Sequence, residues 1–120
     1  SVKNAIINFS KIKKKNSKKY LLLGDMLELG KKTDVYHENL SYFINKSDID
    51  KLFIYGKNAF KTYQKTYKAK QGNILQNIND FDDVFSNLIN KNDYLMIKGS
   101  NAMGLNNLSR KIIIGDKYAI

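Results

Sequence analysis

Residues 21–30 read Leu21-Leu22-Leu23-Gly24-Asp25-Met26-Leu27-Glu28-Leu29-Gly30, an apolar run that stops at a glycine and continues into two carboxylates and a second glycine. A short apolar run bounded by glycine is typical of a buried strand that passes into a loop. A second place of this kind is Lys98-Gly99-Ser100-Asn101, which follows the apolar run 94–97 and precedes a helical pattern. The rest of the chain is expected to hold these two loops.

Apolar spacing predicts helices and strands in alternation along the chain. Strands are expected at residues 20–23, 52–55, 74–75 and 94–97, with a short edge strand within 113–120. Helices are expected at 2–13, from 33 or 34 onward, from 58, from 80 to 89, and around 105–112. Strands that alternate with helices predict the α/β class: a mainly parallel sheet with helices on both faces.

Several helices carry more specific expectations. Ser1 is a candidate N-cap for the first helix, Thr33 or Asp34 for the second, and Asp80 for the fourth. The second helix is expected to bury an apolar stripe of Tyr36, Leu40, Phe43 and Ile44. The third helix is expected to bury a stripe of Ala59, Phe60, Tyr63 and Tyr67. Residues 11–19 are interpreted as a solvated basic linker.

Loops that leave parallel strands and enter helices share one edge of the sheet, and ligands bind at that edge. The two loops described above are of this kind. Gly24 and Gly30 are either turn residues or positions that let a ligand approach the backbone, with Asp25 and Glu28 accepting hydrogen bonds from a cation or hydroxyl. Two glycines at this spacing do not make a dinucleotide fingerprint.

The second loop has two interpretations of equal weight. Lys98, Gly99 and Ser100 stand where a strand passes into a helix, so free amides, the helix dipole and an ammonium favour an anion. Alternatively, Ser100 is only an N-cap beside a surface lysine. His37 is more often a packed or surface histidine than a catalyst, and Met26 is most simply a core or boundary residue.

Composition restricts the class of protein. The 120 residues fit one domain, and the absence of cysteine excludes thiol chemistry and favours a cytoplasmic setting. A single histidine excludes a multi-histidine metal site, and no apolar run reaches the ~20 residues of a membrane span. The net charge of +10 suggests a nucleic-acid partner, but only Arg110 among 21 basic residues is arginine, so drift of surface positions is preferred.

Taken together, the motifs G-D-M-L-E-L-G at 24–30, His37, and K-G-S-N at 98–101 resemble the carboxy-terminal domain of MurF-type Mur ligases. The resemblance spans essentially the whole chain. It implies a single Rossmann-like domain over residues 1–120, with the domains that bind the UDP substrate and ATP lying upstream. The residues that match the family pattern are Gly24, Asp25, Met26, Glu28, Leu29, Gly30, His37, Lys98, Gly99 and Ser100.

The resemblance further implies a cytoplasmic, ATP- and magnesium-dependent ligase of peptidoglycan precursor synthesis. Its substrates would be D-alanyl-D-alanine and UDP-N-acetylmuramoyl-tripeptide, with ATP and Mg²⁺ bound mainly by the central domain. Asp25, Glu28, Lys98, Gly99 and Ser100 are then expected to bind substrate, whereas no catalytic residue or metal ligand is assigned. The 120-residue chain alone is expected to be a monomer without turnover.

Two departures from the family pattern concern the loops. Asn101 stands where an arginine usually follows K-G-S, and Lys31 stands where an acidic residue commonly follows Gly30. A phosphate or carboxylate contact normally made by that arginine would be missing or taken over by Lys98. The alternative function is a stand-alone α/β module that binds nucleic acid or another polyanion through its basic surface.

Overall fold

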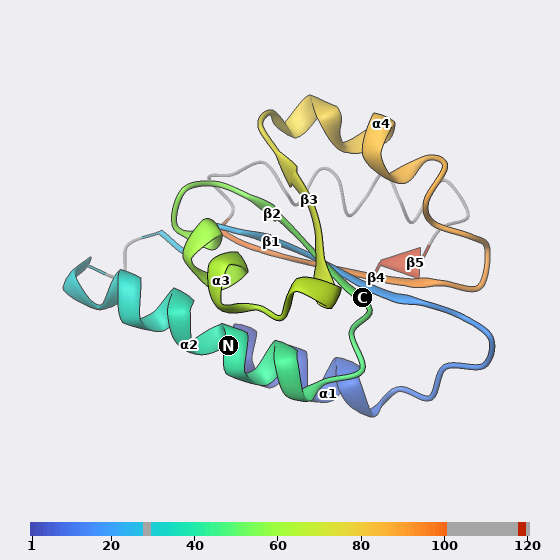
Figure 1. The fold of residues 1–120 in the computed structure, drawn as a ribbon, viewed down its shortest axis with the longest axis horizontal. Helices are drawn as coiled ribbons and strands as arrows, with labels where there is room; N and C mark the ends of the chain where they lie inside the picture. Colours follow the sequence, from blue (N-terminus) through green and yellow to red (C-terminus); the bar gives the residue numbers. More distant parts are fainter. Residues whose placement is uncertain (28–29, 101–117, 120) are drawn as a thin grey trace.

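The computed structural model describes residues 1–27, 30–100 and 118–119, which form one five-stranded sheet with helices on both sides (Figure 1). The strands are β1 (Lys19–Gly24), β2 (Lys51–Tyr55), β3 (Gln71–Leu75), β4 (Tyr94–Lys98) and β5 (Tyr118–Ala119). Their order is β3-β2-β1-β4-β5, and every neighbouring pair is parallel. This is the strand order of a Rossmann fold, so the predicted α/β class is confirmed.

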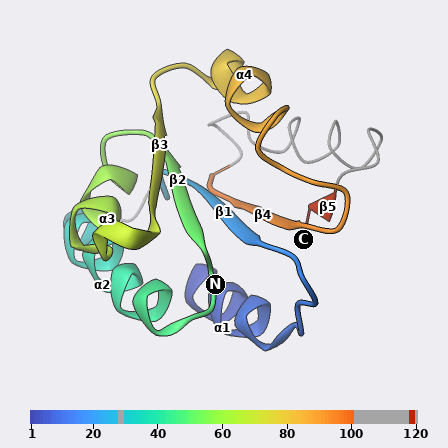
Figure 2. The ribbon, with the colours of Figure 1, turned by 45° about the vertical axis from the view of Figure 1, so that its right-hand side comes forward.

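The helices of the described residues lie on both faces of the sheet. The α-helices are α1 (Val2–Lys11), α2 (Thr33–Lys46), α3 (Ala59–Lys65) and α4 (Phe81–Phe85), with short 3-10 turns η1 (Gly30–Lys32), η2 (Lys68–Lys70) and η3 (Ile78–Asp80). Figures 1 and 2 show α1, α2 and α3 on one face and α4 on the other. The helix expected around 105–112 lies outside the described residues, and the expected edge strand within 113–120 is β5.

The central strand β1 is buried along its whole length, because helices cover both of its faces. Its residues alternate between two cores. Leu21 and Leu23 pack with the buried side of α1 and α2, including Ile6. Leu22 faces the opposite core, where the Phe53 and Phe85 rings meet at 4.6 Å between centroids. The buried β1 therefore fixes the loop that follows Gly24.

The second helix packs its predicted stripe against the core, but its buried centre also includes two polar residues that were not predicted. Its buried residues are His37, Leu40, Ser41 and Ile44, whereas Tyr36 and Phe43 are only partly buried. Neither Thr33 nor Asp34 acts as the N-cap, because the helix continues from η1, and the Thr33 hydroxyl instead donates to the Gly30 carbonyl at 2.8 Å. His37 lies on the side of this helix that faces the core, and it is fully buried.

The third and fourth helices also correct the expectations. On α3 the buried residues are Ala59 and Thr62, whereas Phe60 is 38% exposed and Tyr67, just beyond the helix, is 62% exposed. The α4 helix ends at Phe85, although apolar residues face the core as far as Ile89. Phe81, Phe85 and Ile89 are buried, and Val84 and Leu88 are partly buried. Asp80 stands at the N-cap position of α4, as expected, but its side chain makes no cap bond there. Its carboxylate instead accepts from the Asn77 amide, in the capping box of η3.

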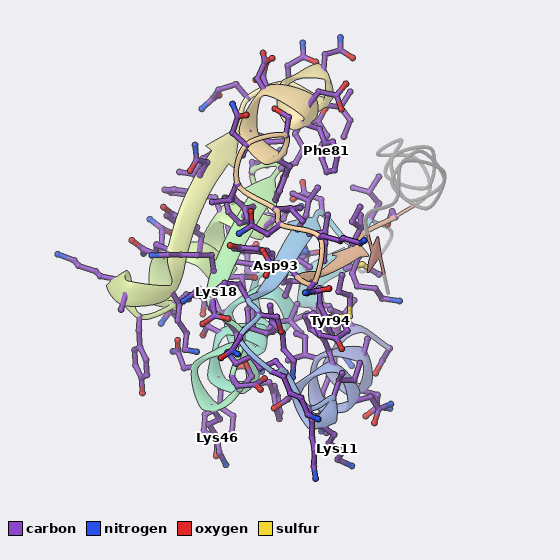
Figure 3. All side chains as sticks on the ribbon, turned by 90° about the vertical axis from the view of Figure 1, so that its right-hand side faces the viewer. Lys11, Lys18, Lys46, Phe81, Asp93 and Tyr94 are labelled. Atoms are coloured by element: carbon purple, nitrogen blue, oxygen red, sulfur yellow. The ribbon has the colours of Figure 1, made fainter. Side chains whose placement is uncertain are left out.

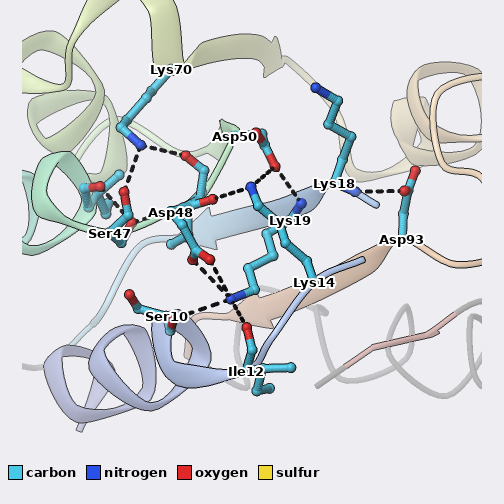
Figure 4. A network of polar contacts seen from close by, with 12 residues as sticks. Ser10, Ile12, Lys14, Lys18, Lys19, Ser47, Asp48, Asp50, Lys70 and Asp93 are labelled. Atoms are coloured by element: carbon cyan, nitrogen blue, oxygen red, sulfur yellow. Dashed lines mark hydrogen bonds and ion pairs between the residues drawn. The ribbon is translucent and has the colours of Figure 1, made fainter. Parts of the chain in front are cut away.

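Residues 11–18 are largely exposed, as expected of a linker, but the ammonium groups of Lys14 and Lys19 tie the stretch to the start of β1 (Figure 4). Lys19 opens β1 and is fully buried; its ammonium contacts both carboxylate oxygens of Asp48 at 2.9 Å and the Ile12 carbonyl. The Lys14 ammonium lies 2.9 Å from Asp50 Oδ2, which also accepts the Lys19 amide at 2.8 Å. A buried lysine of this kind is stable only with such partners.

Candidate functional site

The loops after β1 and β4 meet at one edge of the sheet, as the topology predicts. Leu23 of β1 is in register with Lys98 of β4. The Leu27 amide donates to Ser100 Oγ at 2.7 Å, and the Ser100 amide donates to the Asp25 carbonyl at 3.1 Å. The chain leaves β1 toward β2 on one side while β4 lies on the other, so this is the switch point at which α/β sheets bind ligands.

The carboxylate of Asp25 is turned into the protein. Its side chain is nearly buried, with the residue 5% exposed, and Oδ1 accepts a hydrogen bond of 2.7 Å from the Ala59 amide at the start of α3. The expected cap residue of that helix, Asn58, makes no side-chain cap bond. Asp25 therefore supplies the acceptor for an otherwise unpaired amide of the first helical turn, and it joins the β1 loop to the β2 loop.

His37 holds the same loop from the other side. Its ring is fully buried; Nε2 accepts from the Met26 amide at 3.0 Å, and Nδ1 donates to the Thr33 carbonyl at 2.7 Å. An amide can only donate and a carbonyl can only accept, so the proton of the neutral ring sits on Nδ1. His37 is thus packed in the core, and its two hydrogen bonds position the loop.

A buried threonine extends this support. The Thr62 hydroxyl of α3 donates to the His37 carbonyl at 2.5 Å, and the Thr66 hydroxyl donates to the Thr62 carbonyl at 2.8 Å. Neither residue was predicted to have a role. The signal that could have found them is their spacing with Ala59 at i, i+3 and i+7, which puts small and polar residues on the buried face of α3.

The β4 loop is the more accessible wall of the site. Lys98, Gly99 and Ser100 are all partly exposed, and within residues 1–27 and 30–100 no carboxylate pairs with the Lys98 ammonium. The Ser100 amide is not free for an anion, because it is bound to the Asp25 carbonyl. The Ser100 hydroxyl accepts from Leu27 and can still donate its own proton. The Lys98 ammonium and this hydroxyl are therefore the side-chain donors that this loop offers.

The other predicted residues fall into two groups. Gly24 is the last residue of β1, Met26 packs partly against the core below α2, and Gly30 adopts a left-handed φ of 59° at the start of η1. Glu28, Leu29 and Asn101 lie outside the described residues. In the part of the chain that the structure describes, no group of three His, Asp or Glu side chains could hold a metal ion.

Comparisons with known proteins were made on the whole chain. No protein-family model matches it. It is similar to the UDP-N-acetylmuramoyl-tripeptide–D-alanyl-D-alanine ligase of Bacillus subtilis (strain 168), with 29% identity over 106 residues that cover 80% of this chain and 22% of that protein. The crystal structure of the MurF ligase from Thermotoga maritima in complex with ADP has a similar fold, with a TM-score of 0.67 and 20% identity.

The structural match covers 91% of this chain and 23% of the Thermotoga chain. The chain thus spans less than a quarter of the length of either relative. Both relatives are MurF ligases, so the resemblance drawn from the two loop motifs is confirmed. Neither match supports the alternative of a nucleic-acid-binding module. Among the described residues, no helix combines the length and the hydropathy of a membrane span.

Proposed function

We propose that this chain is the carboxy-terminal domain of an ATP-dependent ligase that adds D-alanyl-D-alanine to UDP-N-acetylmuramoyl-tripeptide in the cytoplasm, during peptidoglycan precursor synthesis. The similarity to the Bacillus subtilis ligase supports this reaction, and the fold supports the family. The observation that carries the proposal is the pair of hydrogen bonds between Ser100 and the 25–27 loop. They hold the two motif loops together at the ligand-binding edge of the sheet.

The role of these loops is to bind and orient the dipeptide. D-Alanyl-D-alanine is a zwitterion, so a site with donors on one wall and a carboxylate on the other fixes its direction. The Lys98 ammonium and the Ser100 hydroxyl are assigned to the dipeptide carboxylate. The Asp25 carboxylate already binds the Ala59 amide, so Asp25 is assigned to positioning the loop, and Glu28 is assigned to the dipeptide ammonium.

Fixing the amine in this way contributes orientation to the reaction. A well-placed nucleophile reacts faster because its translational and rotational freedom is already lost on binding. The described residues offer no triad of acidic or histidine ligands for Mg²⁺. The resemblance to MurF ligases, and not this absence, assigns ATP and Mg²⁺, which would activate the tripeptide carboxylate, mainly to the central domain of the ligase, and the UDP-linked substrate to its other domains. The 120-residue chain alone is expected to show no turnover.

The test is the kinetics of Lys98→Ala in a full-length ligase that contains this chain. The variant is expected to lower kcat/KM for D-alanyl-D-alanine by about 10- to 100-fold, the usual effect of losing a charge-assisted hydrogen bond. The KM values for ATP and the UDP-linked substrate should change little. Lys91→Ala, which removes an exposed lysine before β4, is the matched control. A rise in the ATP KM with an unchanged dipeptide KM would assign Lys98 to ATP instead.

A further inference from the structure

A second polar pocket lies at the amino edge of the sheet, opposite the β1 and β4 loops. It has a volume of about 570 Å³ and is lined by Lys13, Lys15, Ser17, Asn92 and Tyr94. Tyr94 opens β4 in register with Lys19, the first residue of β1, so the pocket lies where these two strands begin. Figure 3 shows this side of the molecule, with Lys18, Asp93 and Tyr94 together and Lys11 and Lys46 pointing outward.

The side chains of Lys13, Lys14 and Lys15 do not all point the same way. Lys14 turns to Asp50 and the Asp48 carbonyl, as Figure 4 shows. Its neighbours Lys13 and Lys15 line the pocket instead. Within residues 1–27 and 30–100, neither of these two ammonium groups forms an ion pair. The pocket therefore holds two positive charges that no described carboxylate neutralises by contact.

The carboxylate next to this pocket is already occupied. Asp93 is 3% exposed; its Oδ1 accepts the Lys18 amide and its Oδ2 accepts the Asn90 amide, both at 2.8 Å. These bonds anchor the 13–18 loop to the turn before β4. Asp93 thus holds in place two segments that line the pocket, while its two oxygens accept from backbone donors and not from Lys13 or Lys15.

Ser17 gives the second, independent indication of a ligand. Its Oγ is the one buried side-chain polar atom among the described residues that has no hydrogen-bond partner. It lines the pocket, directly after Asn16, which turns the chain with a left-handed φ of 51°. Buried hydroxyls are almost always paired, so this one has a hydrogen-bonding capacity that a bound ligand can fill. The hydroxyl can donate to an oxyanion while the two ammonium groups neutralise it.

We propose that this pocket binds a small phosphate-bearing anion through Lys13, Lys15 and Ser17. Two ammonium groups and a hydroxyl match a phosphate dianion with several acceptor oxygens. The volume lies in the range of small-molecule pockets and exceeds the space of one phosphate group, so a phosphate monoester fits it as well. This site is on the opposite edge of the sheet from the proposed dipeptide site, and it does not depend on that assignment.

The test uses the ¹⁵N-labelled 120-residue chain, titrated with inorganic phosphate at constant ionic strength. Saturable shifts are expected at the amides of residues 13–18 and 92–94. Lys13→Ala/Lys15→Ala should weaken binding by about tenfold or more, and Ser17→Ala by about threefold. The double variant Lys65→Ala/Lys68→Ala removes two exposed lysines elsewhere and should leave the affinity unchanged. Ribose 5-phosphate, with ribose as control, shows whether a phosphate ester binds more tightly than the free ion.

Two results would overturn the proposal. Unsaturable shifts spread over the lysine-rich surface, and equal in all variants, would mean an adventitious ion only. The melting temperature of Ser17→Ala in phosphate-free buffer provides the second check. The melting temperature of Ser17→Ala should equal or exceed that of the parent chain, because the hydroxyl has no partner to lose. Added phosphate should raise the melting temperature of the variant less than that of the parent chain. A clear fall would show that Ser17 is satisfied within the protein.

Discussion

Asp25 and Gly56 fit against each other with no room for a side chain at residue 56. A Cβ placed on Gly56 would lie 2.5 Å from Asp25 Oδ1, and the Gly56 backbone has a φ of 117°. The carboxylate occupies this space because it accepts the Ala59 amide. Since the Asp25 carbonyl also accepts the Ser100 amide, one residue joins the loops that follow β1, β2 and β4.

Gly56→Ala should therefore destabilise the chain strongly. The substitution adds a methyl group where the carboxylate lies and imposes a φ that L-residues avoid, so the free energy of unfolding should fall by about 2 kcal/mol or more. Urea denaturation measures it. Gly30→Ala is the matched control, because Gly30 also has a positive φ but its Cβ would meet nothing within 4 Å; its cost should be about 1 kcal/mol. Equal losses for both would contradict the contact with Asp25.

His37→Phe should destabilise the chain by leaving two polar groups unpaired. The ring would still fill the core, but the Met26 amide and the Thr33 carbonyl would lose their partners. Each buried unsatisfied group costs about 1–3 kcal/mol. His37→Gln keeps an acceptor for Met26 and should lose less. If His37→Phe were as stable as the parent chain in urea, the ring would be acting only as an apolar filler.

Asp50 should make the stability of the chain sensitive to acid. Burial alone would raise the pKa of Asp50, but hydrogen bonds from the Lys14 ammonium and the Lys19 amide, with the charges of Lys14 and Lys18, hold it below its ordinary value. A pKa that is lower in the folded state than in the unfolded state stabilises the fold above the unfolded pKa of about 3.9. This contribution is lost as the pH falls through that value toward the folded pKa.

The measurement compares Asp50→Asn with the parent chain by urea unfolding from neutral pH to about pH 3. The variant should be less stable at neutral pH by about 1.5–3 kcal/mol, the usual contribution of hydrogen bonds to a charged group. The difference should shrink as the solution becomes acidic. Asp83→Asn, an exposed aspartate of α4, gives the baseline for the loss of one surface charge. A difference that did not depend on pH would mean that the ion pair contributes nothing.

The strands and the edge that carries the site were predictable from local pattern. The buried run before Gly24 differs from β1 only at its ends, and Tyr94 to Ile97 differs from β4 by one residue. Once strands alternate with helices, the parallel topology puts the loops after them at one edge. The proximity of the 25–27 loop to Ser100 follows from that rule, whereas the hydrogen bond from the Leu27 amide to Ser100 Oγ does not.

The polar contacts that shape the site were not predictable, because their partners are distant in sequence. Asp25 caps a helix that begins 34 residues later, so its carboxylate looked available for a ligand. On α2, a stripe that begins at Tyr36 and one that begins at His37 both have helical spacing. The burial of His37 depends on its bonds to Met26 and Thr33, which the sequence does not show. Lys19 was predicted to belong to a linker, because its ion-pair partner Asp48 is distant in sequence and lies next to it only in the fold.

Ser100→Ala tests whether the contact between the two loops matters for activity more than for stability. Ser100 Oγ accepts the Leu27 amide at 2.7 Å in an exposed position. Water can replace this bond, so the free energy of unfolding should fall by no more than about 1 kcal/mol. In a full-length ligase, however, the dipeptide site would lose both a donor and the link between its walls. The kcat/KM for D-alanyl-D-alanine should fall by about tenfold or more, with little change for the UDP-linked substrate.

Ser47→Ala is the matched control for this experiment. The Ser47 hydroxyl also bridges two backbone groups, donating to the Ile44 carbonyl at 2.6 Å and accepting from the Ile49 amide at 3.1 Å, but it lies at the end of α2, before β2. Its loss should cost at least as much stability and leave the kinetics unchanged. If Ser47→Ala and Ser100→Ala lowered kcat/KM for the dipeptide equally, the effect of Ser100 would come from general destabilisation. A selective fall in Ser100→Ala alone requires the hydroxyl to act at the dipeptide site, because the two variants remove the same group from opposite edges of one sheet.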